Sequence, residues 1–166
     1  MSNKFALLFI LLASAIFISG CIFDKDNGNP LNTTDPGLVP KGNIPPGFTF
    51  LGSHNTSVNI NGKSLNADEE VFRNNNEEVY VQVIKNDNPD ALIAEYMSMY
   101  SKANYDPFEE VSFNGHKATK VKDYLTKNSN QIPYYAIIWT NGSSMNIVGS
   151  LPDAYAVLSL ATATGR

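Results

Sequence analysis

The sequence contains a single cysteine, Cys21, and only two histidines among its 166 residues. One cysteine excludes a disulfide framework and a zinc site built from cysteines. Lys and Arg number 12 against 16 Asp and Glu, so the chain lacks the basic surface with which nucleic-acid-binding proteins neutralise phosphates. The motifs of a nucleophile elbow, a phosphate-binding loop, a dinucleotide-binding turn and a zinc-binding helix are also missing. We therefore expect no catalytic residue, no metal, no cofactor and no nucleic-acid partner, and predict that the protein is not an enzyme.

The one long hydrophobic run lies at the N-terminus. A short polar start that ends in Lys4 is followed by apolar and small residues from Phe5 to Ile18. This run is shorter than the roughly 20 apolar residues that a membrane-spanning helix needs. A charged start, an apolar core and small residues at the end are typical of a secretory signal peptide, which we assign to residues 1–20 and expect to be cleaved.

The signal ends in Ile18, Ser19, Gly20 and Cys21. These four residues resemble the lipobox of prokaryotic lipoproteins: an aliphatic residue, two small residues and the cysteine that carries lipid. The resemblance implies cleavage before Cys21 and lipid on its sulfur, with the membrane as partner. Two lipid chains, at about 0.8 kcal/mol per buried methylene, anchor a protein stably. We therefore expect a lipid-anchored protein on the extracytoplasmic face of the cell membrane. The composition favours an archaeal source, and both bacterial and archaeal lipid chemistry stay open.

Residues 21–44 are dominated after Cys21 by Asn, Asp, Thr, Gly and Pro and show no apolar periodicity. Proline and glycine break helices and strands, so we predict a flexible tether with a reach of about 25 Å. The stretch from Asp24 to Asn29 is rich in calcium-binding residue types. It lacks the glycine and the closing glutamate at the positions that an EF-hand loop requires, which favours a plain polar linker.

Residues 45–166 have the length of one compact domain. Asn88-Pro89-Asp90 is a helix start signal, and apolar residues at helical spacing follow it. A second helix is predicted from Leu151 to Thr164, with Ser150 as its cap, Asp153 completing a capping box and Gly165 ending it.

Before and between these helices the apolar residues alternate with a period of two. Asn-Gly pairs at Asn61, Asn114 and Asn141 separate the alternating segments, and Asn-Gly between apolar runs predicts a tight hairpin turn. The predicted strands are residues 56–61, 63–65, 77–85, 108–113, 116–124, 134–140 and 144–149.

The segment Tyr134–Trp139 is apolar on both faces, which predicts an interior strand covered on both sides. The expected fold is therefore α+β: an antiparallel sheet of hairpins with two main helices, arranged as a three-layer α/β/α sandwich. The element order, together with the closing pattern from Trp139-Thr-Asn-Gly-Ser to Leu-Ala-Thr-Ala-Thr-Gly165, resembles the PsbP-like α/β/α sandwich. That resemblance implies a non-catalytic accessory or binding protein.

Three groups of side chains are candidates for chemistry. His54 and His116, together with loop carboxylates, are the only residues from which a hydrolytic or metal-dependent site could be built. The acidic pairs that begin at Glu69, Glu77 and Glu109 are interpreted as solvated turns and strand ends. The aromatic side chains are interpreted as core, while a ligand groove that contains Tyr134, Tyr135 or Trp139 stays possible.

Three glycosylation sequons begin at Asn32, Asn55 and Asn141, about as many as chance alone produces in this composition. An external location permits their modification.

The sequence as a whole predicts a membrane-anchored lipoprotein whose single domain binds a protein partner or a small ligand without catalysis. The alternatives are a small-molecule receptor with an aromatic-lined pocket and a cell-surface hydrolase.

Overall fold

The computed structural model describes residues 44–165. In this part of the chain the strands and helices follow one another in an order close to the predicted one. They are β1 (Phe48–Ile60), β2 (Lys63–Asn74), β3 (Glu77–Lys85), α1 (Pro89–Ser98), β4 (Phe108–Phe113), β5 (His116–Lys127), β6 (Asn130–Asn141), β7 (Ser144–Leu151) and α2 (Ala154–Thr164).

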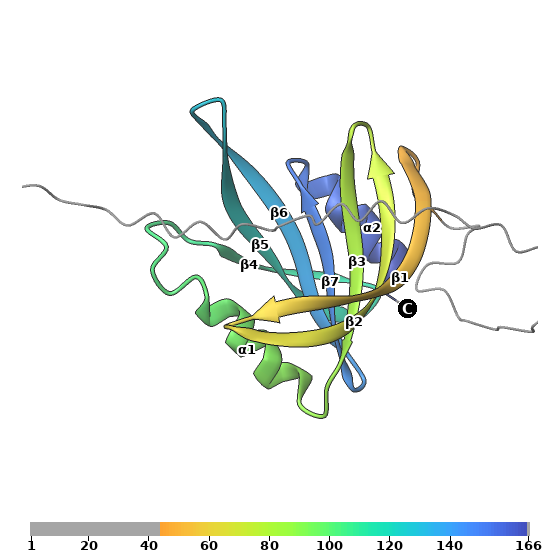
Figure 1. Ribbon diagram of the computed structural model, residues 1–166, viewed down its shortest axis with the longest axis vertical. Helices are drawn as coiled ribbons and strands as arrows, with labels where there is room; N and C mark the ends of the chain where they lie inside the picture. The colour runs from red at the N-terminus through yellow and green to blue at the C-terminus, as the bar shows by residue number, and fades with distance from the viewer. Residues whose placement is uncertain (1–43, 166) are drawn as a thin grey trace, which may run out of the picture. The chain divides into compact units, whose positions relative to one another are not determined.

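The strands form one antiparallel sheet in the order β1-β2-β3-β7-β6-β5-β4. Two sets of hairpin-connected strands, β1–β3 and β4–β7, meet where β3 pairs with β7. The sheet is strongly twisted, and the β5–β6 hairpin projects beyond the other strands (Figure 1). This arrangement confirms the prediction of an α+β fold built on an antiparallel sheet of hairpins with two helices.

The tight turns follow from asparagine and glycine. Asn61 and Gly62 have φ of 50° and 81°, and Asn114 and Gly115 have φ of 47° and 80°. Positive φ at both central residues is the signature of a type I′ turn, which matches the twist of the strands on either side. Two further turns have no Asn-Gly pair: residues 75–76 begin with Asn75 at φ 54°, and residues 128–129 have φ of 52° and 64°.

The prediction for the second helix is wrong at its start. α2 begins at Ala154 rather than at Leu151, and Asp153 is itself the cap: its Oδ1 accepts hydrogen bonds from the backbone N–H groups of Tyr155 and Ala156. Leu151 instead ends β7. α1 begins as predicted, because Asn88 accepts from the Ala91 N–H and Pro89 occupies the first turn.

Apolar side chains fill both faces of the central strands. Ile137 and Ile138 are neighbours in β6, both fully buried, and neighbouring strand residues point to opposite faces. Ile137 belongs to the α2-side core, which contains Phe72, Val79, Val81, Phe113, Ala118, Trp139, Val148, Leu151, Val157, Leu160 and Ala161. Ile138 belongs to the α1-side core, which contains Ile60, Ala67, Ile84, Leu92, Val121, Met145 and Ile147.

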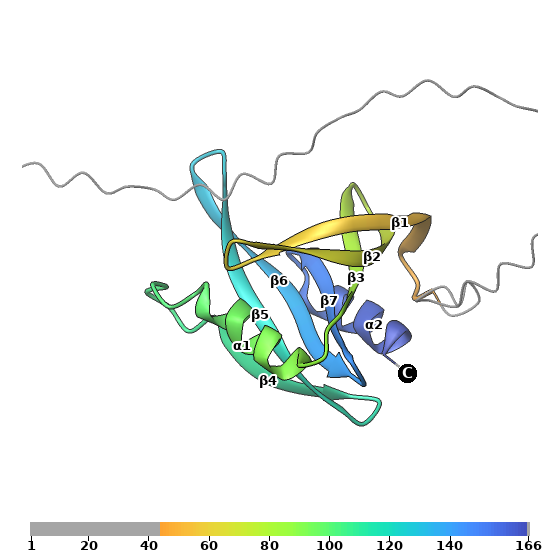
Figure 2. The same cartoon turned by 60° about the horizontal axis from the view of Figure 1, so that its bottom comes forward.

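Figure 2 shows β6 and β7 passing between α1 and α2. The outer part of the sheet is different, since β1 has only one fully buried residue, Ile60, along its length. Polar side chains are therefore spread over both faces of the outer strands, and they provide the candidate functional groups.

Candidate functional site

A polar groove crosses the first three strands. Its volume is about 640 Å³, and Asn55, Ser57, Asn66, Asp68, Val83 and Lys85 supply the side chains that lie on one face there. We call these six residues the polar groove. Each strand contributes because strand side chains alternate between faces, so polar residues two apart in β1 and β2 share a surface.

On the same face of the sheet, the strand register aligns residues of the polar groove with two buried donors that do not line it. The register aligns Asn55 with Asp68, Asp68 with Val83, Val83 with Asn146 and Asn146 with Trp139, which makes one row of side chains on the α2 face. Asn146 and Trp139 are 7% and 2% exposed. Asn146 Nδ2 and Trp139 Nε1 have no hydrogen-bond partner among the described residues. Buried donors are normally satisfied, and these two are enclosed within the protein rather than open to the polar groove.

The charges in the polar groove nearly cancel. Lys85 Nζ lies 3.6 Å from Asp68 Oδ2, and both side chains are largely exposed. An exposed pair of this kind contributes about 0–1 kcal/mol and leaves both groups free to exchange partners. The remaining polar lining consists of amides and a hydroxyl, so the groove suits a polar ligand without a large net charge.

A second polar cluster lies on the opposite face of the same strands. Glu69 of β2 is 7% exposed; its Oε2 accepts a hydrogen bond from Gln82 Nε2 at 2.5 Å, and its Oε1 lies 3.1 Å from His54 Nε2. The three residues are cross-strand neighbours in β1, β2 and β3. The buried carboxylate is therefore satisfied at Oε2 by Gln82, while Oε1 faces the His54 ring.

Tyrosines gather where α1 and its following loop meet β5. The Tyr105 hydroxyl donates to Asp123 at 3.0 Å, and the Lys122 ammonium lies 5.7 Å and 5.9 Å from the ring centroids of Tyr105 and Tyr124. Burial, followed by the hydrogen bond to Asp123, raises the pKa of Tyr105 to about 12. Burial also raises the pKa of Tyr100. These groups satisfy one another, which makes a structural role the simplest account of the cluster.

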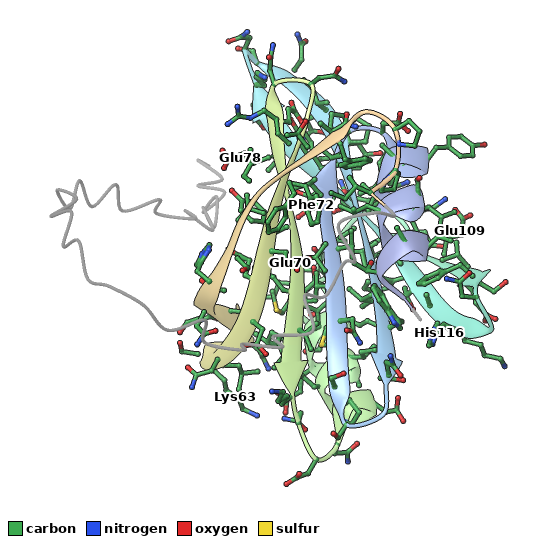
Figure 3. The ribbon with its side chains drawn as sticks, turned by 90° about the vertical axis from the view of Figure 1, so that its right-hand side faces the viewer. Lys63, Glu70, Phe72, Glu78, Glu109 and His116 are labelled. Atoms are coloured by element: carbon green, nitrogen blue, oxygen red, sulfur yellow. The ribbon has the colours of Figure 1, made fainter. Side chains whose placement is uncertain are left out.

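The two histidines do not come together. His54 pairs with Glu69 on one face, whereas the ring of His116 packs against Phe113 and Trp139 on the other face, near the lower end of α2 in Figure 3. Four strands separate β1 from β5, a distance of roughly 24 Å at the usual strand spacing. A hydrolytic or metal site that uses both histidines is therefore not formed.

The aromatic candidates are divided among three places. Trp139 is packed edge-on against Phe113 in the α2-side core, with ring centroids 5.2 Å apart. The Tyr134 hydroxyl donates to Glu77 at 2.9 Å. Tyr135 lines a hollow of about 340 Å³, together with Asp106, Pro107, Phe108, Glu109, Lys120 and Lys122. A groove centred on Trp139 is thus filled by the core, while a pocket with two aromatic residues, Tyr135 and Phe108, remains.

The interpretation of the first acidic pair as a solvated turn is wrong. Glu69 and Glu70 lie in the middle of β2, and they are only 7% and 4% exposed. As neighbours in a strand they point to opposite faces, and Glu70 shares its face of β2 with Phe72 (Figure 3). The sequence shows only that two carboxylates are adjacent. That both side chains are buried follows from the packing of β2 between its neighbouring strands.

The other two acidic pairs are closer to the expectation. Glu77 and Glu78 begin β3, and Glu78 is exposed, but Glu77 is half-buried and one of its oxygens, Oε2, is buried without a partner among the described residues. Glu109 and Glu110 are exposed in β4, a strand at the edge of the sheet.

Of the predicted modification sites, two lie in the described residues. Asn55 is exposed in β1, and Asn141 is exposed at the end of β6. Asn32 and the lipobox residues Ile18, Ser19, Gly20 and Cys21 lie outside the described residues, as do the predicted signal peptide and nearly all of the tether. Within residues 44–165, no helix is both long and apolar enough to cross a membrane.

Sequence reasoning missed Asp68, Gln82 and Asn146, which carry the polar row and the buried carboxylate. The available signal is weak: each is a single polar residue within a strand, and only the register with the neighbouring strands assigns it to a face. Among the described residues no three His, Cys, Asp or Glu side chains are arranged to hold a metal ion.

Comparison of the chain with known proteins finds no matching family model, no matching curated protein and no matching solved structure.

Proposed function

We propose that the chain is a lipid-anchored lipoprotein of the extracytoplasmic face of the cell membrane, and that its domain is a non-catalytic binding module. The observation that carries the binding role is the polar groove across β1, β2 and β3. A surface of amides, a hydroxyl and one weak ion pair offers many hydrogen bonds and no nucleophile held by a base, which suits recognition better than catalysis.

The anchoring part of the proposal is supported by the lipobox residues Ile18 to Cys21. Its test compares Cys21→Ser with Ser19→Ala in the native host. Ser19→Ala keeps a small residue and a lipobox, so the chain is expected to stay in the membrane fraction with an intact mass raised by lipid. Cys21→Ser removes the acceptor sulfur, and the lipid mass is expected to disappear. If Cys21→Ser kept the same added lipid mass as Ser19→Ala, lipidation at Cys21 would be contradicted.

The binding part is tested by cross-linking the full chain in its host membrane, purifying it and identifying partners by mass spectrometry. Asn66→Trp fills the polar groove from β2, whereas Asn104→Trp makes the same change at an exposed position outside it. We expect a stoichiometric partner with the wild type and with Asn104→Trp, and its loss with Asn66→Trp. A partner that Asn66→Trp retains would separate binding from the groove, and recovery of the wild type alone would turn the search to small ligands.

A small-molecule receptor is the second candidate, and the hollow at Tyr135 is the observation that favours it. Tyr135 and Phe108 line the hollow together with charged residues that include Lys120, so it combines apolar and charged groups in about 340 Å³. Native mass spectrometry of the full chain purified from its host tests this role. A bound species that Tyr135→Ala loses and Asn66→Trp keeps would support the receptor, and the reverse pattern would assign the ligand to the polar groove.

We further propose that the fold is a three-layer α/β/α sandwich of the PsbP-like kind. The proposal is supported by the fully buried neighbours Ile137 and Ile138, which join cores that include residues of α2 and of α1. The outer strands, which the helices do not cover in the same way, make the layers incomplete. Substitution of these two isoleucines tests whether both faces of the sheet are closed to water.

A further inference from the structure

β1 is the edge strand of the sheet and, beyond a β-bulge between Phe50 and Gly52, carries no charge or proline to protect it. Along Phe48–Ile60 there is no Lys, Arg, Asp, Glu or Pro. Among the described residues only β2 pairs with it. A long edge strand exposes a row of unpaired N–H and C=O groups, and natural proteins normally cover such edges or block them with charges and prolines.

The opposite edge of the same sheet is protected. β4 spans only Phe108–Phe113, follows Pro107 directly and carries Glu109 and Glu110, both exposed. Short length, an adjacent proline and charges are the devices that prevent pairing with another strand. Because one molecule protects one edge and leaves the other bare, the bare edge of β1 is open to a specific partner strand.

The free backbone groups of β1 can be assigned from the hairpin turn. In a two-residue hairpin the residues next to the turn, Ile60 and Lys63, form a hydrogen-bonded pair, and bonded and non-bonded pairs then alternate along the strands. Counting back from Ile60, the residues whose N–H and C=O groups face outward are Ser53, Asn55, Ser57 and Asn59. The regular register ends at Gly52, where the β-bulge begins.

We propose that β1 pairs antiparallel with β1 of a second copy of this chain, about a twofold axis at Thr56. Thr56 is the centre of the regular segment Gly52–Ile60, so this register is the one that pairs the whole segment with itself. Outward-facing residues then oppose outward-facing residues. The two sheets join into a single continuous antiparallel sheet.

The side chains are compatible with this self-pairing. On the α2 face Asn55 meets Ser57 and Ser53 meets Asn59, so amides oppose hydroxyls. On the other face Thr56 meets Thr56, and threonine pairs are favourable across strands. No like charges are opposed, because the segment carries no Asp, Glu, Lys or Arg. Asn55 and Ser57 line the polar groove, and the dimer therefore brings the two grooves side by side, although pairing does not depend on their ligand.

The first test is disulfide cross-linking of the full chain in mild detergent. In this register the two Thr56 residues form a non-hydrogen-bonded pair with Cα atoms about 4.5 Å apart, within the range that a disulfide spans. Thr56→Cys is therefore expected to give a covalent dimer on mild oxidation, with a disulfide between the two position-56 peptides. Ser112→Cys, exposed on β4, and the wild type with its Cys21 are expected to stay monomeric on a non-reducing gel. Equal cross-linking of Thr56→Cys and Ser112→Cys would overturn the proposal.

The second test measures the oligomeric state by sedimentation. It does not depend on the folding of the cysteine variant. Ser57→Pro removes an outward N–H that the β1–β2 ladder does not use, so the fold is expected to persist while the dimer is lost. Ser112→Pro makes the same change at an outward position of β4 and is expected to leave the dimer intact. Asn66→Trp is also expected to leave it intact, which separates this test from that of the polar groove.

A wild type that sediments as a monomer at every concentration would overturn the proposal. If the β1 amides of such a monomer were still protected from hydrogen exchange, another segment of the chain or a partner protein would occupy the edge instead. A dimer that Ser57→Pro leaves intact would place the interface elsewhere on the molecule.

Discussion

Gly149 in β7 lies against β6 with no room for a side chain. A Cβ atom at this position would lie 2.7 Å from Ala136 Cβ and 3.0 Å from Ala136 Cα. Contacts this short force the strands apart, because protein cores are packed as densely as crystals of small molecules. Gly52 in β1 differs, since a Cβ there meets nothing within 4 Å.

Gly149→Ala is therefore expected to lower the free energy of unfolding by about 1–3 kcal/mol, the usual cost of an overpacked core. Gly52→Ala is the matched control and is expected to change it by less than about 0.5 kcal/mol. Urea denaturation of both variants measures the difference. Equal effects would mean that β6 and β7 do not approach as closely at Gly149 as the structure places them.

Tyr105 makes stability depend on alkaline pH. Its pKa is raised to about 12, by burial first and then by the bond to Asp123, so the folded state keeps the proton after the unfolded chain has lost it near pH 10. A raised pKa stabilises the fold fully below pH 10, and this contribution is lost as the pH rises toward 12. We expect the free energy of unfolding to fall across this window.

Tyr105→Phe is expected to make that fall shallower, because one group that binds its proton more tightly in the folded state is gone. Denaturation at pH 9 and at pH 11 measures the slope. Tyr155→Phe, at an exposed position on α2, is the control and is expected to keep the wild-type slope. If Tyr105→Phe also keeps it, the hydroxyl is not held by Asp123 in solution.

At the scale of the elements, α2 illustrates how a cap decides a boundary. Ser150 and Asp153 are both good cap residues, and the sequence alone favours Ser150 with Asp153 as its partner. The structure uses Asp153, because β7 extends to Leu151 and pairs it with Tyr135 of β6. The pairing of a distant strand therefore selects between two caps that local preference allows.

Asp153→Ala is expected to lower the free energy of unfolding by about 1 kcal/mol, since the N–H groups of Tyr155 and Ala156 lose their acceptor. Asp153→Asn keeps an acceptor oxygen and is expected to recover most of the loss. Urea denaturation distinguishes the two. A larger loss with Ser150→Ala than with Asp153→Ala would restore Ser150 as the cap.

The strands show which patterns are readable. The strand from Glu77 to Lys85 is predicted to its bounds, because valines alternate along it, and the two Asn-Gly turns at Asn61 and Asn114 have the expected positive φ. The predicted pieces of β1 and β2 are much too short. Both strands are polar on parts of both faces, which removes the alternation that identifies a strand.

At the scale of the whole molecule, stability depends on two cores separated by the thickness of the sheet. Ile137 and Ile138 are 0% exposed and belong to different cores, although they are adjacent in β6. A single antiparallel sheet connects the cores through the same backbone, so the domain is expected to unfold in one transition.

Ile137→Ala and Ile138→Ala are each expected to cost about 2–5 kcal/mol, because both leave cavities in buried packing. Leu125→Ala, where the side chain is 50% exposed on the projecting hairpin, is expected to cost much less. Thermal and urea unfolding of the three variants provide the comparison. A small cost for one isoleucine alone would show that its face of the sheet is open to water, against the three-layer arrangement.

The sequence by itself determines the class of the fold, the bounds of the most regular strand and the two Asn-Gly turns. It also determines the expectation of a lipid anchor, because these depend on local preference and on short motifs. The tertiary structure alone decides that His54 and His116 lie on opposite faces, that Glu69 is buried between His54 and Gln82, and that the polar groove aligns with Asn146 and Trp139. These features depend on register between strands that are distant in the chain, and a shift of one residue would move every side chain to the other face.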